Sequence, residues 1–419
     1  MSGLRFAMLA TFYPPYHFGG DAMGAQRLAQ ALVRRGHHVT VIHDADAYLA
    51  LAGSEPTARA ADDGVEIVTL RSRLGALSPL LTQQFGRPVV QGPRIRRLLR
   101  EGRYDVTVFH NVSLVGGPGL LAMGTGVTLY LAHEHWLVCP THVLWRHGRE
   151  VCTGRQCLRC VLHHRRPPQV WRHTGLLERN LKHVDAFVAM SEFSRAKHRE
   201  FGFPREMQVV PYFLPDAEPP SYAPDSSPHP RPYFLFVGRL ERIKGLDDVL
   251  PVFAGFDRAD LLIAGDGDYA PVLRAAAAGN PRVVFLGRVA PADLARYYRH
   301  ATALIVPSVC YETFGIILIE AFRQGTPVIA RRIGPFPEIV ERAGAGEVFL
   351  QPAELEAAMH RFLDEPERRQ RFSTAGRRAF ADTWSESVVV PMFLDLVKRT
   401  ARAKGDQRVA SALEAEEAA

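Results

Sequence analysis

Short runs of apolar residues recur along the chain, and each is followed by a longer stretch with helical spacing. In the first half, the runs that predict buried strands are residues 5–11, 38–44, 65–70, 106–110, 127–132 and 186–190. Between the first two runs, Leu28, Leu32 and Val33 fall on one face of a predicted helix spanning 22–35. Strands that alternate with helices in this way are typical of a parallel sheet covered by helices on both faces.

A second series of the same kind occupies the other half of the chain. Its predicted strands are 233–237, 261–264, 283–286, 303–306 and 327–330. The stretch between the two series, 211–232, is rich in Pro, Ser and Asp and predicts an interdomain linker. We therefore expect two Rossmann-like, doubly wound α/β domains, at 1–210 and 233–384, that face each other across a cleft at the carboxyl ends of their strands.

The last part of the chain is predicted to contain one more helix and a tail. Residues 385–404 predict a C-terminal helix that returns to the N-terminal domain. Residues 405–419, which end in Glu-Ala-Glu-Glu-Ala-Ala, lack apolar partners and predict a flexible tail.

The bulk composition narrows the class of protein and its partners. With 419 residues, 47% hydrophobic and 23% charged, the chain has the composition of a soluble globular protein. No apolar stretch of 18 residues predicts a membrane span, and the apolar N-terminal run is too short for a secretory signal, so we expect a cytoplasmic protein. The net charge of +7 suits a phosphate-rich substrate or the anionic inner face of a membrane. No nucleic-acid-binding motif accompanies this charge, so we expect no nucleic acid partner.

Two carboxylates near the end of the second series, Glu312 and Glu320, are separated by seven residues. Glu312 follows the predicted strand at 303–306 on a short loop, and Glu320 lies inside a helix that begins near Gly315. The free N–H groups of residues 313–316 would attract an anion such as a diphosphate. One carboxylate could then bind sugar hydroxyls and the other a ribose; the alternative is an ordinary amphipathic helix with two solvated acids.

Two cations follow the first strand of the second series. Gly238 and Arg239 come directly after that strand, and Lys244 comes five residues after Arg239. A guanidinium fork and an ammonium at this spacing can converge on one diphosphate. The alternative is a pair of solvated surface cations.

Together these segments resemble the E-x7-E and G-R-L-x-x-x-K-G motifs of the retaining glycosyltransferases of family 4, which have the two-domain GT-B fold. The resemblance implies a nucleotide-sugar donor, linked to UDP or GDP, and a reaction without a catalytic metal in which the departing phosphate takes the acceptor's proton. The implied catalytic residues are His133, Arg239, Lys244 and Glu312. The implied donor-binding residues are Gly19, Gly20, Gly238, Gly265, Gly267, Gly287, Val289, Thr313, Phe314, Gly315, Ile316 and Glu320.

The resemblance also implies what the charged residues do. Arg239 and Lys244 would hold the donor's phosphates and stabilise charge on the leaving group. Glu312 would position the sugar, and Glu320 would bind the ribose.

Three glycine-containing turns are assigned through the same resemblance. Gly265 and Gly267 match a Gly-x-Gly turn of the donor domain, so the neighbouring Asp266 and Asp268 are not taken as a metal-binding D-x-D. The segment 287–289 matches the one whose backbone reads the nucleobase. The Gly19-Gly20 pair matches a loop that lies against the donor diphosphate; the alternative is a plain strand–helix turn.

A polar cluster, His133-Glu134-His135-Trp136, directly follows the predicted strand at 127–132. Its position at a strand end predicts that it lines the cleft. In the family a histidine at this point contacts the transferred sugar. His133 is the better match and His135 competes with it, while a structural histidine is the alternative for both.

Four cysteines, Cys139, Cys152, Cys157 and Cys160, lie within an insertion at about 134–168 and have the spacing C-x12-C-x4-C-x2-C. In a cytoplasmic protein such clustering favours metal over disulfides, and four thiolates would complete a structural zinc site. An iron–sulfur cluster and reactive thiols are alternative uses. Alternative zinc ligands are His142, His147, His163 and His164.

The acceptor side is less well determined. Residues 91–100 surround an apolar face with arginines, and such a helix can either lie on an anionic membrane or pack on the sheet. Pro335 stands where the family's Gly-Gly-x-Pro-Glu run has glycine, so contacts at that loop are not carried over.

We expect a glycan, lipid-linked or small-molecule acceptor. The alternatives to a transferase are a nucleotide-sugar 2-epimerase of the same fold and a zinc-stapled, non-catalytic scaffold.

Overall fold

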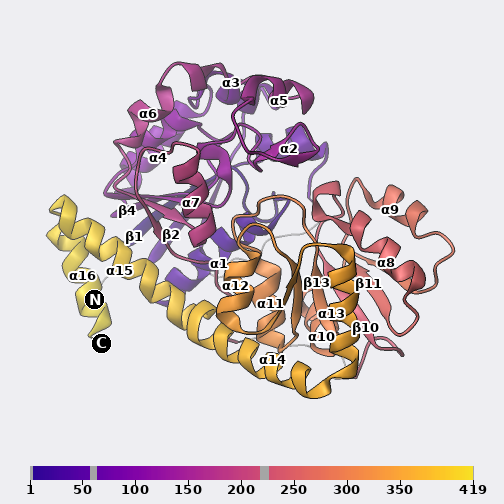
Figure 1. Ribbon diagram of the computed structural model, residues 1–419. Helices are drawn as coiled ribbons and strands as arrows, with labels where there is room; N and C mark the ends of the chain where they lie inside the picture. The colour runs from indigo at the N-terminus through magenta and orange to yellow at the C-terminus, as the bar shows by residue number, and fades with distance from the viewer. Residues whose placement is uncertain (1–2, 57–63, 218–225, 419) are drawn as a thin grey trace. The chain divides into compact units, whose positions relative to one another are not determined.

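The computed structural model describes residues 3–56, 64–217 and 226–418. Its contacts divide the chain into two compact units (Figure 1). The first contains Met1–Gly148, Thr153–Tyr212 and Val389–Ala419, and the second contains Arg149–Cys152 and Phe213–Val388. Each unit has one large parallel sheet, so the prediction of two doubly wound Rossmann-like domains is confirmed.

The first unit is built on seven parallel strands in the order β3-β2-β1-β4-β5-β8-β9. These are β1 (Arg5–Ala10), β2 (His38–Asp44), β3 (Glu66–Leu70), β4 (Val106–Phe109), β5 (Val127–Ala132), β8 (Ala186–Ala189) and β9 (Met207–Val209). Most residues of the central strands are buried, which explains why the sequence shows continuous apolar runs rather than alternation. Strand β9 was not predicted, because it is only three residues long.

Helices of the first unit pack on this sheet and around its edges. They are α1 (Gly20–Arg34), α2 (Ala45–Ala52), α3 (Leu77–Phe85), α4 (Gly92–Gly102), α5 (Cys157–His163), α6 (Leu176–Leu181), α7 (Glu192–Glu200) and α16 (Gln407–Glu417), with short helices at Pro118–Met123 (η1), His135–Leu137 (η2) and Val170–His173 (η3). Two-residue strands, β6 (Trp145–Arg146) and β7 (Glu150–Val151), lie in the cysteine-rich segment. The arginine-rich helix α4 buries Ile95 and Leu99 in the core, so it packs on the sheet.

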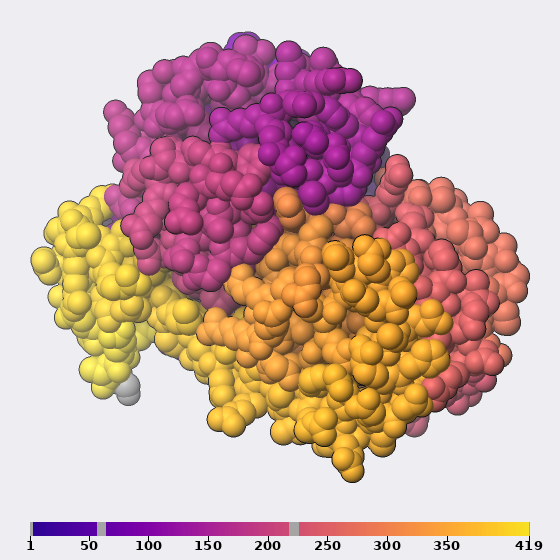
Figure 2. All heavy atoms as spheres, in the orientation of Figure 1, coloured from indigo at the N-terminus to yellow at the C-terminus, as the bar shows by residue number. Residues whose placement is uncertain are grey.

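The second unit is built on six parallel strands in the order β12-β11-β10-β13-β14-β15. They are β10 (Tyr233–Val237), β11 (Asp260–Ala264), β12 (Val283–Gly287), β13 (Ala303–Val306), β14 (Val328–Arg331) and β15 (Gly346–Phe349). The helices are α8 (Leu250–Gly255), α9 (Ala270–Ala276), α10 (Pro291–His300), α11 (Ile316–Gln324), α12 (Phe336–Ala343), α13 (Pro352–Asp364) and α14 (Pro366–Ala379). Residues of α13 and α14 form part of the surface of this unit, in light orange (Figure 2).

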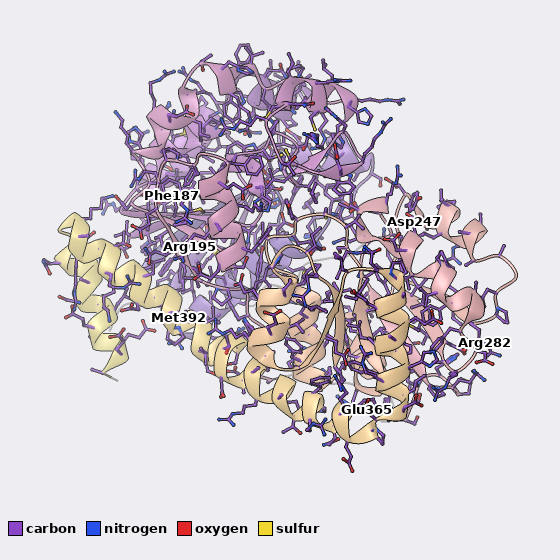
Figure 3. All side chains as sticks on the ribbon, in the orientation of Figure 1. Phe187, Arg195, Asp247, Arg282, Glu365 and Met392 are labelled. Atoms are coloured by element: carbon purple, nitrogen blue, oxygen red, sulfur yellow. The ribbon has the colours of Figure 1, made fainter. Side chains whose placement is uncertain are left out.

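A buried carboxylate ties the first residues of the second sheet together. Asp260, at the start of β11, accepts hydrogen bonds from His229 at 2.7 Å, Arg231 at 3.2 Å and Arg282 at 3.1 Å; Arg282 is labelled in Figure 3. Burial opposes ionisation of Asp260, but these three partners hold its pKa below the usual value. The group therefore fixes the segment before β10 to β11 and β12.

The end of the chain differs from the prediction. The helix α15 (Glu386–Lys404) is followed by α16, so the expectation of a flexible tail at 405–419 is wrong. Asp406 caps α16 by accepting from the N–H of Val409, and Val409, Ala410 and Leu413 are buried. The acidic residues of this segment are paired rather than solvated: Glu417 binds Lys398 at 2.6 Å and Glu414 binds Arg402 at 2.6 Å.

The segment predicted as the linker, 211–232, is described only in part, because 218–225 lie outside the described residues. Its first residues are packed rather than exposed: Tyr212 is buried in the first unit, and Phe213 and Leu214 are buried in the second. Among the residues with described structure, no helix has the length and apolar character needed to cross a bilayer.

Each sheet has a point at which its strand order reverses, and this point determines where loops can form a ligand-binding crevice. In each sheet the order reverses beside the first strand, between β1 and β4 and between β10 and β13. Loops that leave the carboxyl ends of such neighbouring strands in opposite directions open a crevice where ligands of α/β sheets bind. The predicted site residues follow β1 and β5 in the first unit, and β10, β11, β12 and β13 in the second.

Candidate active site

Lys244, Glu312 and Ser308 form a charged cluster at the reversal point of the second sheet. The Nζ of Lys244 donates to Oε1 of Glu312 at 2.7 Å, and the hydroxyl of Ser308 donates to the same oxygen at 2.8 Å. The Lys244 and Glu312 side chains are 23% and 20% exposed. The pair is therefore shielded from bulk water yet remains open to a ligand.

Close backbone packing holds this cluster in place. Gly245 has a φ of +74°, and a Cβ there would lie 2.0 Å from the carbonyl oxygen of Pro307. The N–H of Val309 donates to the carbonyl of Ile243 at 2.9 Å, so the loops after β10 and β13 are joined directly. Gly245 does not begin an α-helix. It lies between two 3-10 turns, and α8 begins only at Leu250.

Lys244 and Glu312 each favour the charged form of the other. Burial opposes the charge on Glu312, but Lys244 and the hydrogen bonds that Glu312 accepts lower its pKa below the usual value. Burial likewise opposes the charge on Lys244, while Glu312 raises its pKa above the usual value. Both groups therefore carry charge at neutral pH. The adjacent Cys310 is buried and its pKa is raised to about 12, so it remains a neutral thiol.

Helix α11 begins immediately beyond this cluster, as predicted. Its N-cap, Gly315, has a φ of +110°, and a Cβ there would lie 2.8 Å from the ring of Phe336. A larger residue would therefore meet both backbone strain and α12. No side chain caps the helix, so its N-terminal dipole is directed into the loop that carries Glu312.

The other predicted cation is more loosely held. Arg239 is 55% exposed and pairs with Glu241 at 2.9 Å. It also contributes to the lowered pKa of Glu312, after Lys244 and Ser308. The guanidinium can therefore exchange its weak surface partner for a ligand at little cost.

The predicted glycine turns pack against each other. A Cβ on Gly265 would lie 1.9 Å from the carbonyl oxygen of Gly238, and one on Gly267 would lie 2.5 Å from that of Leu240. The N–H of Gly265 also donates to the carbonyl of Gly287 at 2.7 Å. These glycines allow the loops after β10, β11 and β12 to approach closely. Val289 is partly buried and lies two residues beyond the end of β12.

The second carboxylate of the motif lies on the first turns of α11. Glu320 accepts a hydrogen bond from the buried hydroxyl of Tyr298 on α10 at 3.0 Å. Tyr298 was missed by the sequence analysis, because only the packing of α10 on α11 brings it to Glu320.

In the first unit, the predicted Gly-Gly pair marks the start of α1. Gly19 is the N-cap in an extended conformation, Gly20 is the first helical residue, and Asp21 lies in the first turn. No side chain caps this helix either. The turn follows β1 at the reversal point of the first sheet.

His133 lies in a buried hydrogen-bonded chain of three side chains. Its Nε2 is 2.7 Å from Nδ1 of His110, and its Nδ1 is 2.5 Å from the hydroxyl of Tyr212. The two imidazole rings are stacked with centroids 5.0 Å apart. Burial lowers the pKa of His133 to about 4, although Asp21 opposes this, so the ring is neutral at pH 7. His110 and Tyr212 were not predicted as site residues.

His135, the competing histidine, is more deeply placed. It is buried beside His198, with ring centroids 5.2 Å apart, and neither of its ring nitrogens has a hydrogen-bond partner among the described atoms. Both candidates are buried, and the choice between them as a sugar contact stays a prediction.

The four clustered cysteines are spread over several local elements. Cys157 and Cys160 lie on α5, Cys139 follows η2, and Cys152 belongs to the second unit. None of them forms a disulfide. Within 3–56, 64–217 and 226–418, no three Cys, His, Asp or Glu side chains are grouped as a metal ion requires. The side-chain arrangement thus does not present a formed zinc site, and zinc binding stays a prediction.

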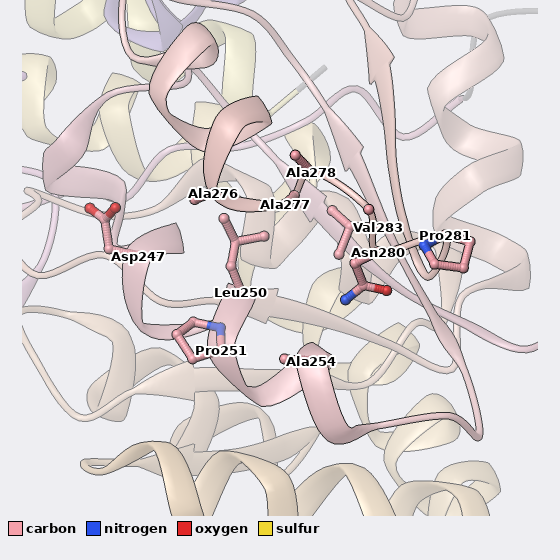
Figure 4. Close-up of a pocket in the computed structure, with 11 residues that line it drawn as sticks. Asp247, Leu250, Pro251, Ala254, Ala276, Ala277, Ala278, Asn280, Pro281 and Val283 are labelled. Carbon is pink, nitrogen blue, oxygen red and sulfur yellow. The ribbon is translucent and has the colours of Figure 1, made fainter.

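A cavity of about 460 Å³ lies elsewhere in the second unit, between α8 and the loop before β12 (Figure 4). Its lining is mostly alanine, proline and leucine, with Asp247 and Asn280 as the polar members. None of the predicted site residues lines it. It therefore adds no chemistry to the cluster around Lys244.

Two family models match the chain. Residues 19–212 match the glycosyl transferase 4-like domain, and residues 223–379 match the glycosyl transferases group 1 domain. Among curated relatives, D-inositol 3-phosphate glycosyltransferase of Thermobifida fusca is 33% identical over 37% of this chain and 40% of its own length. Glycogen synthase of Mycobacterium tuberculosis is 26% identical over 90% of each chain. The matches span 40%, 29% and 53% of the length of the first three curated relatives.

Solved structures share the fold over nearly the whole chain. Sucrose-phosphate synthase from Thermosynechococcus elongatus has a TM-score of 0.73 at 19% identity, and the match covers 96% of this chain and 100% of that one. HepE from Anabaena, solved in complex with UDP and glucose, has a TM-score of 0.66 at 16% identity, covering 94% and 100%. At these identities the likeness shows the fold.

Proposed function

Because this chain belongs to the family-4-like glycosyltransferases with the GT-B fold, we propose that it transfers a sugar from a nucleotide-sugar donor to a hydroxyl acceptor with retention of anomeric configuration. The observation that carries the proposal is the cluster of Lys244, Glu312 and Ser308 at the reversal point of the second sheet, beside the uncapped start of α11. Cationic and helix N–H groups at one strand edge suit a diphosphate.

The cluster can act on the donor without being dismantled. An ammonium group has three N–H donors, so Lys244 can keep its contact with Glu312 while it donates to a phosphate oxygen. Arg239 can leave Glu241 to bind the same diphosphate. Glu312, ionised and anchored by two donors, has lone pairs left to accept from a sugar hydroxyl.

In the proposed reaction, the bond between the anomeric carbon and the phosphate oxygen breaks as the acceptor oxygen bonds to the same face of that carbon. The acceptor's proton passes to the departing phosphate oxygen. Negative charge grows on that phosphate, and Lys244, Arg239 and the N–H groups at the start of α11 would stabilise it. Glu320 would bind the ribose, and His133 would contact the sugar.

The donor nucleotide is proposed to be UDP or GDP, and the acceptor a glycan, a lipid-linked sugar or a small molecule. Differential thermal denaturation with UDP, GDP, ADP and TDP tests the first part, since a ligand that binds the native state raises its melting temperature. Product analysis by NMR then tests retention. A protein that binds none of the four nucleotides would contradict the proposal.

The 2-epimerase of the same fold is distinguished by its substrate requirement. It would convert the nucleotide sugar without any acceptor, whereas a transferase would release the nucleotide only slowly by hydrolysis.

The proposed reaction needs no catalytic metal, so transfer should persist in EDTA. Loss of activity on chelation, with recovery on adding Mg²⁺ or Mn²⁺, would contradict the metal-independent reaction.

Structural zinc remains part of the proposal on the strength of the cysteine spacing alone. Elemental analysis of protein purified without added metal should find one zinc per chain. A zinc-free protein of full stability would overturn this part while leaving the donor site intact.

A further inference from the structure

Helix α3 in the first unit buries two hydroxyl side chains beside Pro79 and exposes two of its leucines. Ser78 and Thr82 are buried, at 1% and 3% exposure, while Leu77 and Leu80 are 46% and 41% exposed. A surface helix normally does the opposite and buries its apolar side. The Thr82 hydroxyl donates to the carbonyl of Ser78 at 3.2 Å within the helix, while the Ser78 hydroxyl is buried without a hydrogen-bond partner among the described atoms. Packing within the unit therefore does not account for the leucines.

Further apolar side chains lie around α3. Phe85 ends the helix at 59% exposure, and Leu74 and Val89 flank it at 50% and 48%. The short helix η3 packs against α3 and adds Val170 at 60% exposure; its Trp171 donates to the carbonyl of Gln83 at 2.9 Å. We call these six residues the α3 face: Leu74, Leu77, Leu80, Phe85, Val89 and Val170. Soluble monomers rarely gather so many large exposed apolar side chains without a partner.

The sequence segment that carries α3 has formal charges of one sign only. Residues 67–100 contain seven arginines and no Asp or Glu. Arg71 is matched by Glu55 at 2.8 Å, but Arg73 and Arg87 are exposed and have no ion pair within the described parts of the chain. Apolar side chains that emerge among unpaired arginines complement a surface with anionic groups above an apolar layer.

We propose that the α3 face docks this protein onto the surface of an anionic lipid bilayer. Leu77, Leu80 and Phe85 enter the boundary between headgroups and acyl chains, and Arg73 and Arg87 lie at the level of the lipid phosphates. The arginine-rich α4 does not provide this contact, because its apolar face is already buried against the sheet. The inference is independent of the donor site in the second unit.

Co-sedimentation with vesicles tests this without any donor or acceptor. The full chain should bind vesicles of phosphatidylcholine mixed with phosphatidylglycerol, should bind phosphatidylcholine alone weakly, and should be released by added salt. Arg73→Gln with Arg87→Gln should lower the partition coefficient roughly 25-fold, since each basic side chain near an anionic surface contributes about fivefold. Leu77→Gln with Leu80→Gln and Phe85→Gln should lower it by at least about tenfold per residue.

A matched control comes from the second unit, where Val272 and Leu350 are 48% and 51% exposed. Val272→Gln with Leu350→Gln should leave vesicle binding unchanged. Circular dichroism and the thermal midpoint establish that each variant is folded. Wild-type protein that ignores anionic vesicles, or a triple variant that binds them as well as wild type, would overturn the proposal. A concentration-dependent dimer that the triple variant abolishes, without vesicle binding, would instead make the α3 face a contact between two copies of this chain.

Discussion

Lys244 is the side chain on which the proposed chemistry depends most. Lys244→Met removes the ammonium group while keeping the length of the side chain, so we expect kcat/KM to fall by at least 100-fold, or roughly 3 kcal/mol of transition-state stabilisation. Steady-state kinetics at saturating acceptor would measure this. Lys182→Met, at an exposed lysine of the first unit, is the control and should have wild-type activity.

A second prediction concerns the buried chain of His110, His133 and Tyr212. Tyr212→Phe removes only the hydroxyl that meets Nδ1 of His133, which leaves a buried ring nitrogen without its partner. We expect a loss of about 1–3 kcal/mol in the free energy of unfolding, measured by urea titration. Tyr48→Phe, at a partly exposed tyrosine, should change it by less than about 0.5 kcal/mol. Equal effects of the two variants would show that the hydroxyl of Tyr212 is not structurally important.

Sequence spacing predicted part of this residue-level picture. Lys244 and Glu312 were each predicted as site residues, but their ion pair was not, because it depends on β10 and β13 being neighbours in the sheet. Ser308 lies only four residues before Glu312, so it could have been predicted as a third member of this cluster. Tyr212 is different, because it is 79 residues from His133, and only the packing of its ring against α1 at Gly24 brings it there.

Among the elements, we expect the loop after β11 to be sensitive to substitution. Gly265 combines a φ of +144° with a Cβ position 1.9 Å from a backbone oxygen that cannot move aside. Gly265→Ala should therefore cost at least about 3 kcal/mol in unfolding free energy and weaken nucleotide binding. Thermal denaturation with and without nucleotide would measure both effects.

Gly279→Ala is the matched control for this loop. Gly279 also has a positive φ, +81°, but no atom lies within 4 Å of its Cβ position. Its substitution should cost only the backbone strain, about 1–2 kcal/mol. A Gly265→Ala protein as stable as the Gly279→Ala protein would refute the close approach of these loops.

Element boundaries were predicted well wherever a run of apolar residues was long enough. The strands at 38–44, 127–132, 233–237 and 303–306 were predicted with the bounds that the structure gives. Helix α16 was missed because its apolar contribution is small: Val409, Ala410 and Leu413 form one narrow stripe among charged residues. Those charges looked solvated in the sequence, but their partners come from α15 and from distant loops.

At the scale of the whole molecule, buried histidines are concentrated in one unit. Burial lowers the pKa of the following histidines, all of which lie in the first unit: His37, His43, His110, His133, His135, His164 and His198. The pKa is lowered to about 4 for His43, His133 and His198. An unfolded chain binds these protons at about pH 6.5, so the unfolded state holds more protons between pH 6.5 and pH 4.

Stability of the first unit should therefore fall as the pH drops through this window, and should be insensitive to these histidines above it. A depression of this size corresponds to on the order of 3 kcal/mol for each fully buried histidine. Hydrogen exchange read by mass spectrometry at pH 7.5 and pH 5 can follow each unit separately. We expect peptides of β4 and β5 to lose protection before those of β10 and β13. Simultaneous loss in both units would contradict this.

The fold class of both units follows from the alternation of apolar runs and helices, whereas the order of the strands in each sheet was not predicted. What the sequence did not determine is where the chain changes from one unit to the other. The structure places the change between Tyr212 and Phe213, within three buried residues that looked like the start of an open linker.

The return of residues 389–419 to the first unit has a consequence for synthesis of the protein. Ribosomes extend the chain from its N-terminus, so the sheet of the first unit emerges long before α15 and α16, whose Lys404 and Arg408 bind Asp185 and Asp105 just before two of its strands. The second unit has all of its strands once residue 349 has emerged. We therefore expect the later-made unit to become protease-resistant first. Nascent chains stalled with residues 389–419 still inside the ribosomal tunnel should yield a resistant fragment from 226–388, while residues 3–212 remain cleavable until 389–419 have left the tunnel. Early resistance of the N-terminal fragment would exclude this order of maturation.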